Sequence, residues 1–324
     1  MPKSNDELMM ETMYWWGIPT LFRCPNKSDP NDCDIALVGV PHSTGNGTTE
    51  RDQHLGPRAV RHVSAGLRSA HLDFQINPWD EKQIHDLGDV PLPEANNNEK
   101  CIEDITNFYE KIALAKKPVV SIGGDHSITG GILQGLSKDN LSLTDGKKIS
   151  FLHIDAHTDT FNQLDHFLGA KKSAAHWGSY LVDDGIIDPT SSMQIGMRGN
   201  PRTLDWLQPS YDLGYNLVTM QEFKNRGMQD VINETLDKLG DNPIYITFDL
   251  DSLDASIAPA VSNIEPSFKG FNMEEAKSII QSVRNKNVIG GDVVCLMPTK
   301  DSPNNITAMV AASMMFEIIS VIAY

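Results

Sequence analysis

The sequence has few cysteines, and they form no recognisable redox or metal-binding motif. Four thiols are scattered over 324 residues, at Cys24, Cys33, Cys101 and Cys295, without a Cys-x-x-Cys pair. The first residues, Met-Pro-Lys-Ser-Asn-Asp-Glu, also lack the apolar region of a secretion signal. We therefore expect reduced thiols and a cytoplasmic location.

Basic side chains are in deficit. The chain has 27 Lys and Arg against 43 Asp and Glu, a formal net charge of −16. This charge repels a nucleic-acid backbone, so we expect no nucleic-acid partner. It would attract a small cationic substrate, although we attribute most of it to the solubility of a cytosolic protein.

No Pro/Gly/Ser linker, charge block or internal repeat divides the chain. This predicts one catalytic domain over residues 34–324. Residues 1–33 include the run Trp15-Trp16-Gly17-Ile18-Pro19-Thr20. We expect this aromatic segment to pack on the body of the protein or on a neighbouring subunit.

Long apolar runs are also scarce. The most apolar stretch, residues 306–324, approaches membrane-spanning length but contains Thr307, Ser313, Glu317 and Ser320. We therefore predict a packed C-terminal helix that begins at Asn304 or Asn305, and no membrane partner.

The chain is rich in short β-branched runs that alternate with stretches long enough for helices. The predicted strands are Asp34–Val40, Pro118–Ile122, Ile149–Asp155, Met193–Met197, Ile244–Asp249 and Val288–Leu296. The predicted helices are Pro57–Ala65, Cys101–Ala115, His126–Leu136, Met220–Asn225, Met228–Leu239 and Met273–Arg284. This alternation predicts an α/β fold with a mostly parallel sheet between helices.

Three of these strands are followed at once by side chains that bind metals. The six are His126 in Gly-Gly-Asp-His-Ser, Asp155, His157 and Asp159 in Asp-Ala-His-Thr-Asp, and Asp249 and Asp251 in Phe-Asp-Leu-Asp-Ser-Leu-Asp. Each cluster alone is as well explained by a turn or a solvated loop. Because ligands of α/β sheets bind beyond the carboxyl ends of the strands, three clusters at strand ends indicate one site.

Four carboxylates beside two imidazoles would repel one another unless cations compensated them. The sequence therefore predicts two divalent ions per chain. Oxygen-rich ligation with two imidazoles suits Mn²⁺ first, and Ni²⁺, Co²⁺ or Fe²⁺ could use the same ligands. The absence of thiolates among the six argues against a structural zinc site.

These motifs resemble those of the ureohydrolases, the arginase/agmatinase family. The likeness runs from about Asp34 to the C-terminus and includes Gly39-Val40-Pro41, residues 55–61 and Gln194-Ile195-Gly196-Met197-Arg198. It implies an arginase-like three-layer α/β/α sandwich with a mostly parallel sheet, and a homo-oligomer, commonly a trimer or hexamer. It also implies a small cationic guanidino substrate and a metal-dependent enzyme that releases urea.

The resemblance assigns roles to the six side chains. Asp155 and Asp249 would bridge two ions, Mn²⁺ or Ni²⁺. His126 and Asp159 would complete the coordination of one ion, and His157 and Asp251 that of the other.

The guanidinium carbon is a poor electrophile, so hydrolysis needs more than neutral water. Two divalent ions can supply hydroxide, because coordination lowers the pKa of water from about 15.7 towards roughly 7. Asp159 would orient the hydroxide and carry a proton to the departing nitrogen. We expect His176, in Ala-His-Trp-Gly, to shuttle protons at the pocket mouth, and Trp177, where the family has glycine, to narrow or re-aim that mouth.

Further polar residues have supporting roles. His153 shares a strand face with Asp155, which predicts a hydrogen bond near the ligands. Asp125 would orient a helix start or bond to a ligand imidazole, and Asp254 would fix its loop. His42 lies in a Gly-containing loop suited to lining the pocket.

The sequence departs from the family pattern at two recognition segments. Asn263 lies in Val-Ser-Asn-Ile-Glu, where the family has Pro-Gly/Ala-Thr-Gly-Thr-Pro. Cys295 stands where a family glutamate pairs with the guanidinium, which removes a contact worth about 1.5–3 kcal/mol. We place both residues in the substrate pocket.

We interpret these departures as retained hydrolysis with changed recognition. This favours guanidine, a small N-substituted guanidine or a biguanide as substrate, with agmatinase- or guanidinobutyrase-type activity as the alternative. A non-catalytic subunit of a mixed oligomer is a further alternative, which the six intact ligands oppose. A single-zinc deacetylase is a weaker one, because it needs fewer carboxylates.

Overall fold

The computed structural model describes residues 9, 13, 15–47, 50–138, 143–161, 169–266 and 268–324. An eight-stranded sheet in the order β2-β1-β3-β8-β7-β4-β5-β6 runs through this part of the chain. The strands are β1 Ile35–Gly39, β2 Ile84–Asp89, β3 Val119–Ile122, β4 Ser150–Ile154, β5 Met193–Met197, β6 Asn216–Thr219, β7 Ile244–Asp249 and β8 Val288–Val294. Every pairing between neighbours is parallel, which confirms the predicted α/β class.

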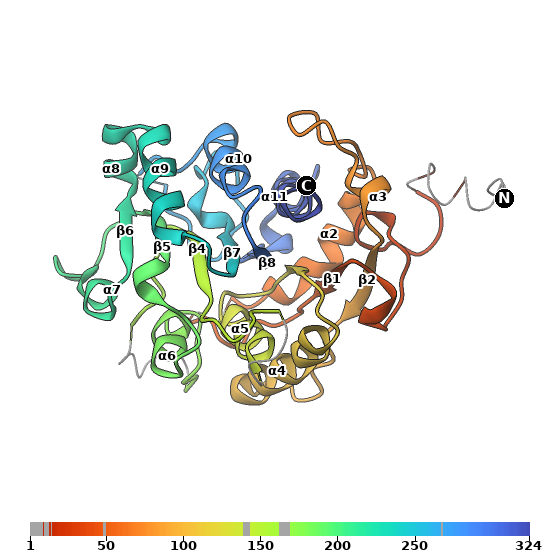
Figure 1. The fold of residues 1–324 in the computed structure, drawn as a ribbon, viewed down its shortest axis with the longest axis horizontal. Coiled ribbons are helices and arrows are strands. Elements are labelled where there is room, and N and C mark those ends of the chain that lie inside the picture. Colours follow the sequence, from red (N-terminus) through yellow and green to blue (C-terminus); the bar gives the residue numbers. More distant parts are fainter. Residues whose placement is uncertain are drawn as a thin grey trace.

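Helices cover both faces of the sheet (Figure 1). They are α2 Gly56–Ser64, α3 Pro78–Glu81, α4 Asn98–Leu114, α5 Ile128–Leu136, α6 Trp177–Asp183, α7 Gln208–Leu213, α8 Met220–Arg226, α9 Met228–Leu239, α10 Met273–Ser282 and α11 Ile306–Ala323. One buried cluster joins the sheet to α2, α8, α9, α10 and α11, and a second joins its other face to α4, α5 and α6. The protein is thus a three-layer α/β/α sandwich, as the resemblance implies.

The two edge strands, β2 and β6, escaped prediction. Within β2 the sequence Ile-His-Asp-Leu-Gly-Asp has no apolar run, and Asp86 is nevertheless buried because Arg61 pairs with it at 2.8 Å. β6 is four residues long and only Val218 among them is fully buried. An edge strand packs against one neighbour only, so its sequence is less constrained to be apolar.

The C-terminal helix α11 is long and apolar enough to cross a membrane by length and composition alone, yet 72% of it is buried inside the protein. Asn305 precedes it in a left-handed conformation (φ 54°), close to the predicted start. The cap comes instead from Asp301, whose carboxylate accepts hydrogen bonds from Thr307 N and Ala308 N. α11 therefore behaves as a core helix.

The end of the N-terminal segment packs on the body of the protein. Leu21 and Phe22 are fully buried, and their backbone N–H groups donate to Asp86 and Ser64. Further towards the N-terminus, Trp15 is 69% exposed. The predicted homo-oligomer and cytoplasmic location stay predictions.

Candidate metal centre

The six predicted side chains meet at the carboxyl ends of β3, β4 and β7, which lie in the order β3-β8-β7-β4 within the sheet. His126 Nδ1 lies 3.0 Å from Asp155 Oδ2, 3.0 Å from Asp159 Oδ2 and 3.2 Å from Asp249 Oδ2. These four residues make one half of the centre.

The other half surrounds His157. Its Nδ1 lies 3.4 Å from Asp155 Oδ1 and 3.1 Å from Asp251 Oδ2. Asp155 thus presents one carboxylate oxygen to each imidazole. This is the arrangement that a bridging ligand needs.

The spacing of the Asp residues follows from the turns they make. Asp155 Oδ1 accepts a 2.7 Å hydrogen bond from His157 N, and Asp249 Oδ1 accepts one of 2.9 Å from Asp251 N. Such contacts to the backbone two residues on are typical of Asx turns. Asp249 lies beside one imidazole only, that of His126, which its Oδ2 faces at 3.2 Å, and its bridging role stays a prediction.

The Gly-Gly-Asp-His turn requires its glycines. A Cβ atom on Gly124 would lie 1.6 Å from the carbonyl oxygen of His42, so no other residue fits there. Asp125 then accepts hydrogen bonds from Ser127 N (3.0 Å) and Gly45 N (2.9 Å). Asp125 therefore fixes the start of α5 and the loop after β1, and this positions His126.

The charge balance of the centre calls for cations. Burial lowers the pKa of His126, but the carboxylates of Asp155, Asp159 and Asp249 outweigh it and raise that pKa well above its ordinary value. Burial, and then the charge of Asp249, raise the pKa of Asp251 well above the usual range. Buried like charges are thus too many for the imidazoles to neutralise.

Two buried polar atoms point to the same conclusion. Among the described residues, neither His126 Nδ1 nor Asp251 Oδ2 has a hydrogen-bond partner. Each lies in a different half of the centre, and buried polar atoms are seldom left without partners. Nitrogen and carboxylate oxygen donors in this number fit two divalent ions.

His153 contacts the centre as expected. Gln194 Nε2 donates to His153 Nδ1 at 3.0 Å, so His153 Nε2–H donates to Asp155 Oδ2 at 2.8 Å. Asp254 fixes its loop, also as expected, by accepting from Ser256 N and Gly270 N.

The prediction that Trp177 narrows the pocket mouth is wrong. Trp177 is fully buried at the start of α6, and its indole Nε1 donates to Asp159 Oδ2 at 2.9 Å. The ring packs between His126 and His153, with centroids 5.0 Å from each. It supports the centre from inside the protein.

His176, the predicted proton shuttle, is 7% exposed. It precedes α6, and Ser173 Oγ lies 2.7 Å from its Nδ1. Its side chain does not line the open cavity that adjoins the centre, so the expected position at the mouth is wrong. Its role in proton transfer stays a prediction.

That cavity, of about 630 Å³, opens beside His157, whose side chain is 31% exposed. Glu265 lies in the cavity wall with its Oε1 3.5 Å from His157 Nε2. Asn263, Arg202 and Trp206 line the same space. Asn263 was expected there, whereas no sequence motif pointed to Glu265, Arg202 or Trp206.

Arg198 also borders the cavity but serves the centre. Its guanidinium donates to the carbonyl oxygens of Asp251 (2.5 Å), Ser252 (3.0 Å) and Leu253 (2.9 Å). These contacts fix the loop that carries Asp251. The arginine of Gln-Ile-Gly-Met-Arg is therefore a structural support.

The other two predicted pocket residues lie elsewhere. His42 is buried, with its Nε2 2.9 Å from Asn98 Oδ1, because the chain turns inward after β1. Cys295 is buried in a left-handed conformation (φ 70°), and its Sγ lies within 4.8 Å of ligand atoms of His126 and Asp249. Burial, and then the charges of Asp249 and Asp251, raise the pKa of the Cys295 thiol well above its ordinary value.

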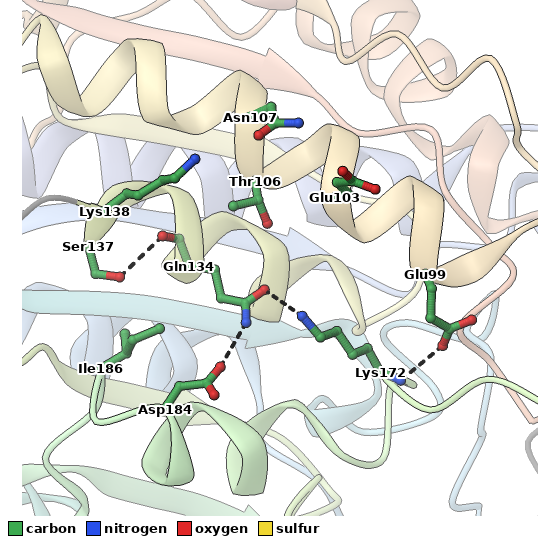
Figure 2. Close-up of a pocket in the computed structure, with 10 residues that line it drawn as sticks. All are labelled: Glu99, Glu103, Thr106, Asn107, Gln134, Ser137, Lys138, Lys172, Asp184 and Ile186. Atoms are coloured by element: carbon green, nitrogen blue, oxygen red, sulfur yellow. Dashed lines mark hydrogen bonds between the residues drawn. The ribbon is translucent and has the colours of Figure 1, made fainter.

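A second cavity, of about 600 Å³, lies between α4, α5 and α6 (Figure 2). None of the six clustered residues lines it. Its polar side chains form hydrogen bonds with one another. For example, Gln134 Oε1 accepts a hydrogen bond from Lys172 Nζ at 3.1 Å, and Gln134 Nε2 donates one to Asp184 Oδ2 at 2.8 Å. The candidate active site is therefore the cavity beside His157.

Comparison with known proteins agrees with this geometry. The model of the arginase family matches residues 33–320. The chain belongs to the arginase family. The predicted family is thus confirmed, and with it a metal-dependent ureohydrolase whose two-halved cluster fits the family's dinuclear divalent metal site.

Individual relatives align over nearly the whole chain. The human mitochondrial guanidino acid hydrolase is 33% identical over 94% of this chain and 82% of its own length. A guanidinopropionase of Pseudomonas aeruginosa is 31% identical over 95% and 92%. The structure of proclavaminate amidino hydrolase from Streptomyces clavuligerus superposes with a TM-score of 0.85 at 25% identity, covering 96% of this chain and 98% of that one.

Proposed function

We propose that this protein hydrolyses the guanidino group of an ω-guanidino carboxylic acid and releases urea and an amino acid. The observation that carries the proposal is the cavity beside His157, which has a carboxylate near the metal centre and, in its wall, an arginine that pairs with none of the described residues. The names of the guanidino acid hydrolase and guanidinopropionase relatives support the same substrate class.

The carboxylate is Glu265. Its Oε1 lies 3.5 Å from His157 Nε2 and so stands at the junction of cavity and metal centre. A guanidinium group held there would bring its carbon towards the ligands while Glu265 accepts its N–H groups. Glu265 can therefore take over the pairing that Cys295 has lost.

The arginine is Arg202. No ion pair or hydrogen bond engages its guanidinium within the part of the chain that the structure describes, in contrast to Arg198. A free guanidinium binds a carboxylate through two parallel hydrogen bonds. It would repel the free amine of agmatine, so the cavity favours an acid.

The size of the cavity also favours a substituted substrate. A volume of about 630 Å³ is far more than guanidine itself fills. The argument from sequence for a very small substrate rested on Trp177 at the mouth and on the missing glutamate. Trp177 is buried elsewhere, and Glu265 supplies a carboxylate.

Two divalent ions, with Mn²⁺ proposed first and Ni²⁺ as the alternative, supply a hydroxide nucleophile when bound, because coordination lowers the pKa of water to roughly 7. His126, Asp155, His157, Asp159, Asp249 and Asp251 would hold them. Asp155 lies beside both imidazoles and so fixes the position of one set of ligands relative to the other.

Proton transfer falls to Asp159. Its Oδ2 accepts from Trp177 Nε1, and no hydrogen bond engages its Oδ1 among the described residues. The Trp177 contact fixes the plane of the carboxylate, which leaves Oδ1 to take a proton from the hydroxyl group once that group has added to the guanidinium carbon. Asp159 then passes that proton to the departing nitrogen as the C–N bond breaks.

The test is a urea-release assay on protein loaded in turn with Mn²⁺ and Ni²⁺. The panel is 3-guanidinopropionate, 4-guanidinobutyrate, agmatine, arginine, guanidine and N-methylguanidine. We expect the highest kcat/KM for one of the guanidino acids. A higher value for guanidine or N-methylguanidine would restore the small-substrate interpretation, and no urea from any of them with both ions bound would indicate a non-catalytic subunit.

A further inference from the structure

A chain of buried hydrogen bonds leads from the metal centre into the sheet. Thr247 Oγ1 lies 2.8 Å from His126 Nε2, on the side of the ring opposite the carboxylates. The same hydroxyl donates to Asp292 Oδ1 at 2.7 Å. Thr247 and Asp292 face each other in the register of β7 and β8, and both are fully buried.

Asp292 is surrounded by hydroxyl groups. Its Oδ2 accepts from Thr129 Oγ1 and from Tyr245 OH, each at 2.9 Å. No lysine or arginine pairs with it in the described part of the chain. A carboxylate that accepts hydrogen bonds from three hydroxyl groups, two on β7 and one on α5, is held in one orientation.

This arrangement determines which ring nitrogen of His126 carries the N–H when the imidazole is neutral. A threonine hydroxyl has one proton, and the proton of Thr247 goes to Asp292. The oxygen of Thr247 must therefore accept from His126 Nε2–H. In the neutral imidazole that binds a metal, Nε2 then carries the only N–H, so Nδ1 presents its lone pair on the side where Asp155 and Asp159 lie.

Among the described residues, the second imidazole of the centre has no buried hydroxyl beside its outer nitrogen. His157 Nε2 faces Glu265 at 3.5 Å across a partly open cavity. The buried hydroxyl and carboxylate are specific to His126, the imidazole that sits among three carboxylates.

We propose that Thr247 and Asp292 are positioning residues that hold His126 in the tautomer and orientation required for metal binding. The inference rests on the metal centre of the proposed function but not on any substrate. Hydrogen-bond partners of a metal-binding histidine typically change metal affinity by about 10- to 100-fold when they are removed.

The experiment compares metal binding to the wild-type protein and to Thr247→Val, which keeps the side-chain shape and removes the hydroxyl. Mn²⁺ affinity and stoichiometry are measured by competition with a chelator. We expect one of the two ions to bind about 10- to 100-fold more weakly and the other to keep its affinity. Thr247→Ser, which restores the hydroxyl, should recover most of the loss.

Tyr109→Phe is a matched control. It also removes a buried hydroxyl from this core, one that bonds to Ser121 Oγ at 2.6 Å, whereas the hydroxyl beside His126 Nε2 is that of Thr247. Both ions should bind to it as they do to the wild type. Circular dichroism establishes that each variant is folded.

The tautomer of His126 can also be measured by NMR in the wild-type protein, so this test does not depend on whether Thr247→Val folds. Zinc is diamagnetic, so ¹⁵N NMR spectra of zinc-loaded wild-type protein with labelled histidines report which nitrogen of His126 carries the proton. The signals of His126 are assigned by their loss in the spectrum of His126→Asn. We expect a hydrogen-bonded Nε2–H. A proton on Nδ1, or two ions bound to Thr247→Val with wild-type affinity, would overturn the proposal, while failure of the urea assay alone would leave it standing.

Discussion

Trp177 Nε1 donates a 2.9 Å hydrogen bond to Asp159 Oδ2, the carboxylate oxygen that lies 3.0 Å from His126 Nδ1. Asp159 has a left-handed backbone (φ 52°), and Gly178 N donates to its carbonyl oxygen at 2.9 Å. The first turn of α6 thus holds the residue to which we assign proton transfer, at both its backbone and its side chain.

We therefore predict that Trp177→Phe lowers kcat by about 10- to 100-fold, which corresponds to the 1.5–3 kcal/mol typical of a hydrogen bond to a charged group. The aromatic packing on His126 and His153 is largely kept, so the fold and the metal content should persist. Steady-state kinetics of urea release are the measurement. Trp79→Phe is the control, because the indole nitrogen of Trp79 has no hydrogen-bond partner among the described residues. Equal rates for the two variants would contradict the role of Trp177.

A second prediction separates two aspartates of one motif. Asp249→Asn should nearly abolish urea release and reduce bound metal, because an amide cannot replace the charge that faces His126. Asp254→Asn should be milder, since the carboxylate of Asp254 accepts hydrogen bonds from Ser256 and Gly270 of its own loop. Activity and elemental analysis of both variants test this. Equal losses with unchanged metal content would mean that the roles within the motif are misassigned.

Arg202→Ala should raise KM for a guanidino acid by about 10-fold or more and change kcat little, because the lost contact is to the carboxylate far from the reacting carbon. Its KM for N-methylguanidine, which has no carboxylate, should not change. Arg58→Ala removes an exposed arginine of α2 that does not line the cavity and is the matched control. If the KM values for the acid and for N-methylguanidine rise together, Arg202 does not bind the carboxylate.

The cysteines give a prediction on stability. Burial raises the pKa of Cys33 and of Cys101 to about 11, above an ordinary value near 9. Between pH 9 and 11 the unfolded chain loses these protons while the folded chain retains them, so the free energy of unfolding should fall as pH rises through this window. Urea denaturation at several pH values measures the slope. Cys101→Ala should reduce that slope, and an unchanged slope would show that this thiol does not contribute.

The metal centre could be predicted from the sequence because its ligands lie in short motifs, each directly after a buried strand. Asp155, His157 and Asp159 follow a buried strand at fixed spacing, and a parallel sheet brings strand ends to one edge. The α/β class was predicted from the alternation of apolar strand segments with stretches long enough for helices. Strands β2 and β6 were missed because edge strands tolerate polar residues.

The substrate side could not be predicted in this way. Glu265 and Arg202 are far apart in the sequence and share a cavity only after folding. Trp177 was misplaced because its position next to His176 does not reveal which side of α6 faces the core. The link from Asp292 to Thr247 depends on the register of β7 and β8, which no single segment specifies.

The central claim is a dinuclear centre that shares Asp155, and anomalous X-ray scattering at the manganese edge tests it most directly. Crystals grown with Mn²⁺ should give two peaks of similar height on either side of Asp155, one next to His126 and the other next to His157. A single peak, or peaks that do not contact Asp155, would contradict the account.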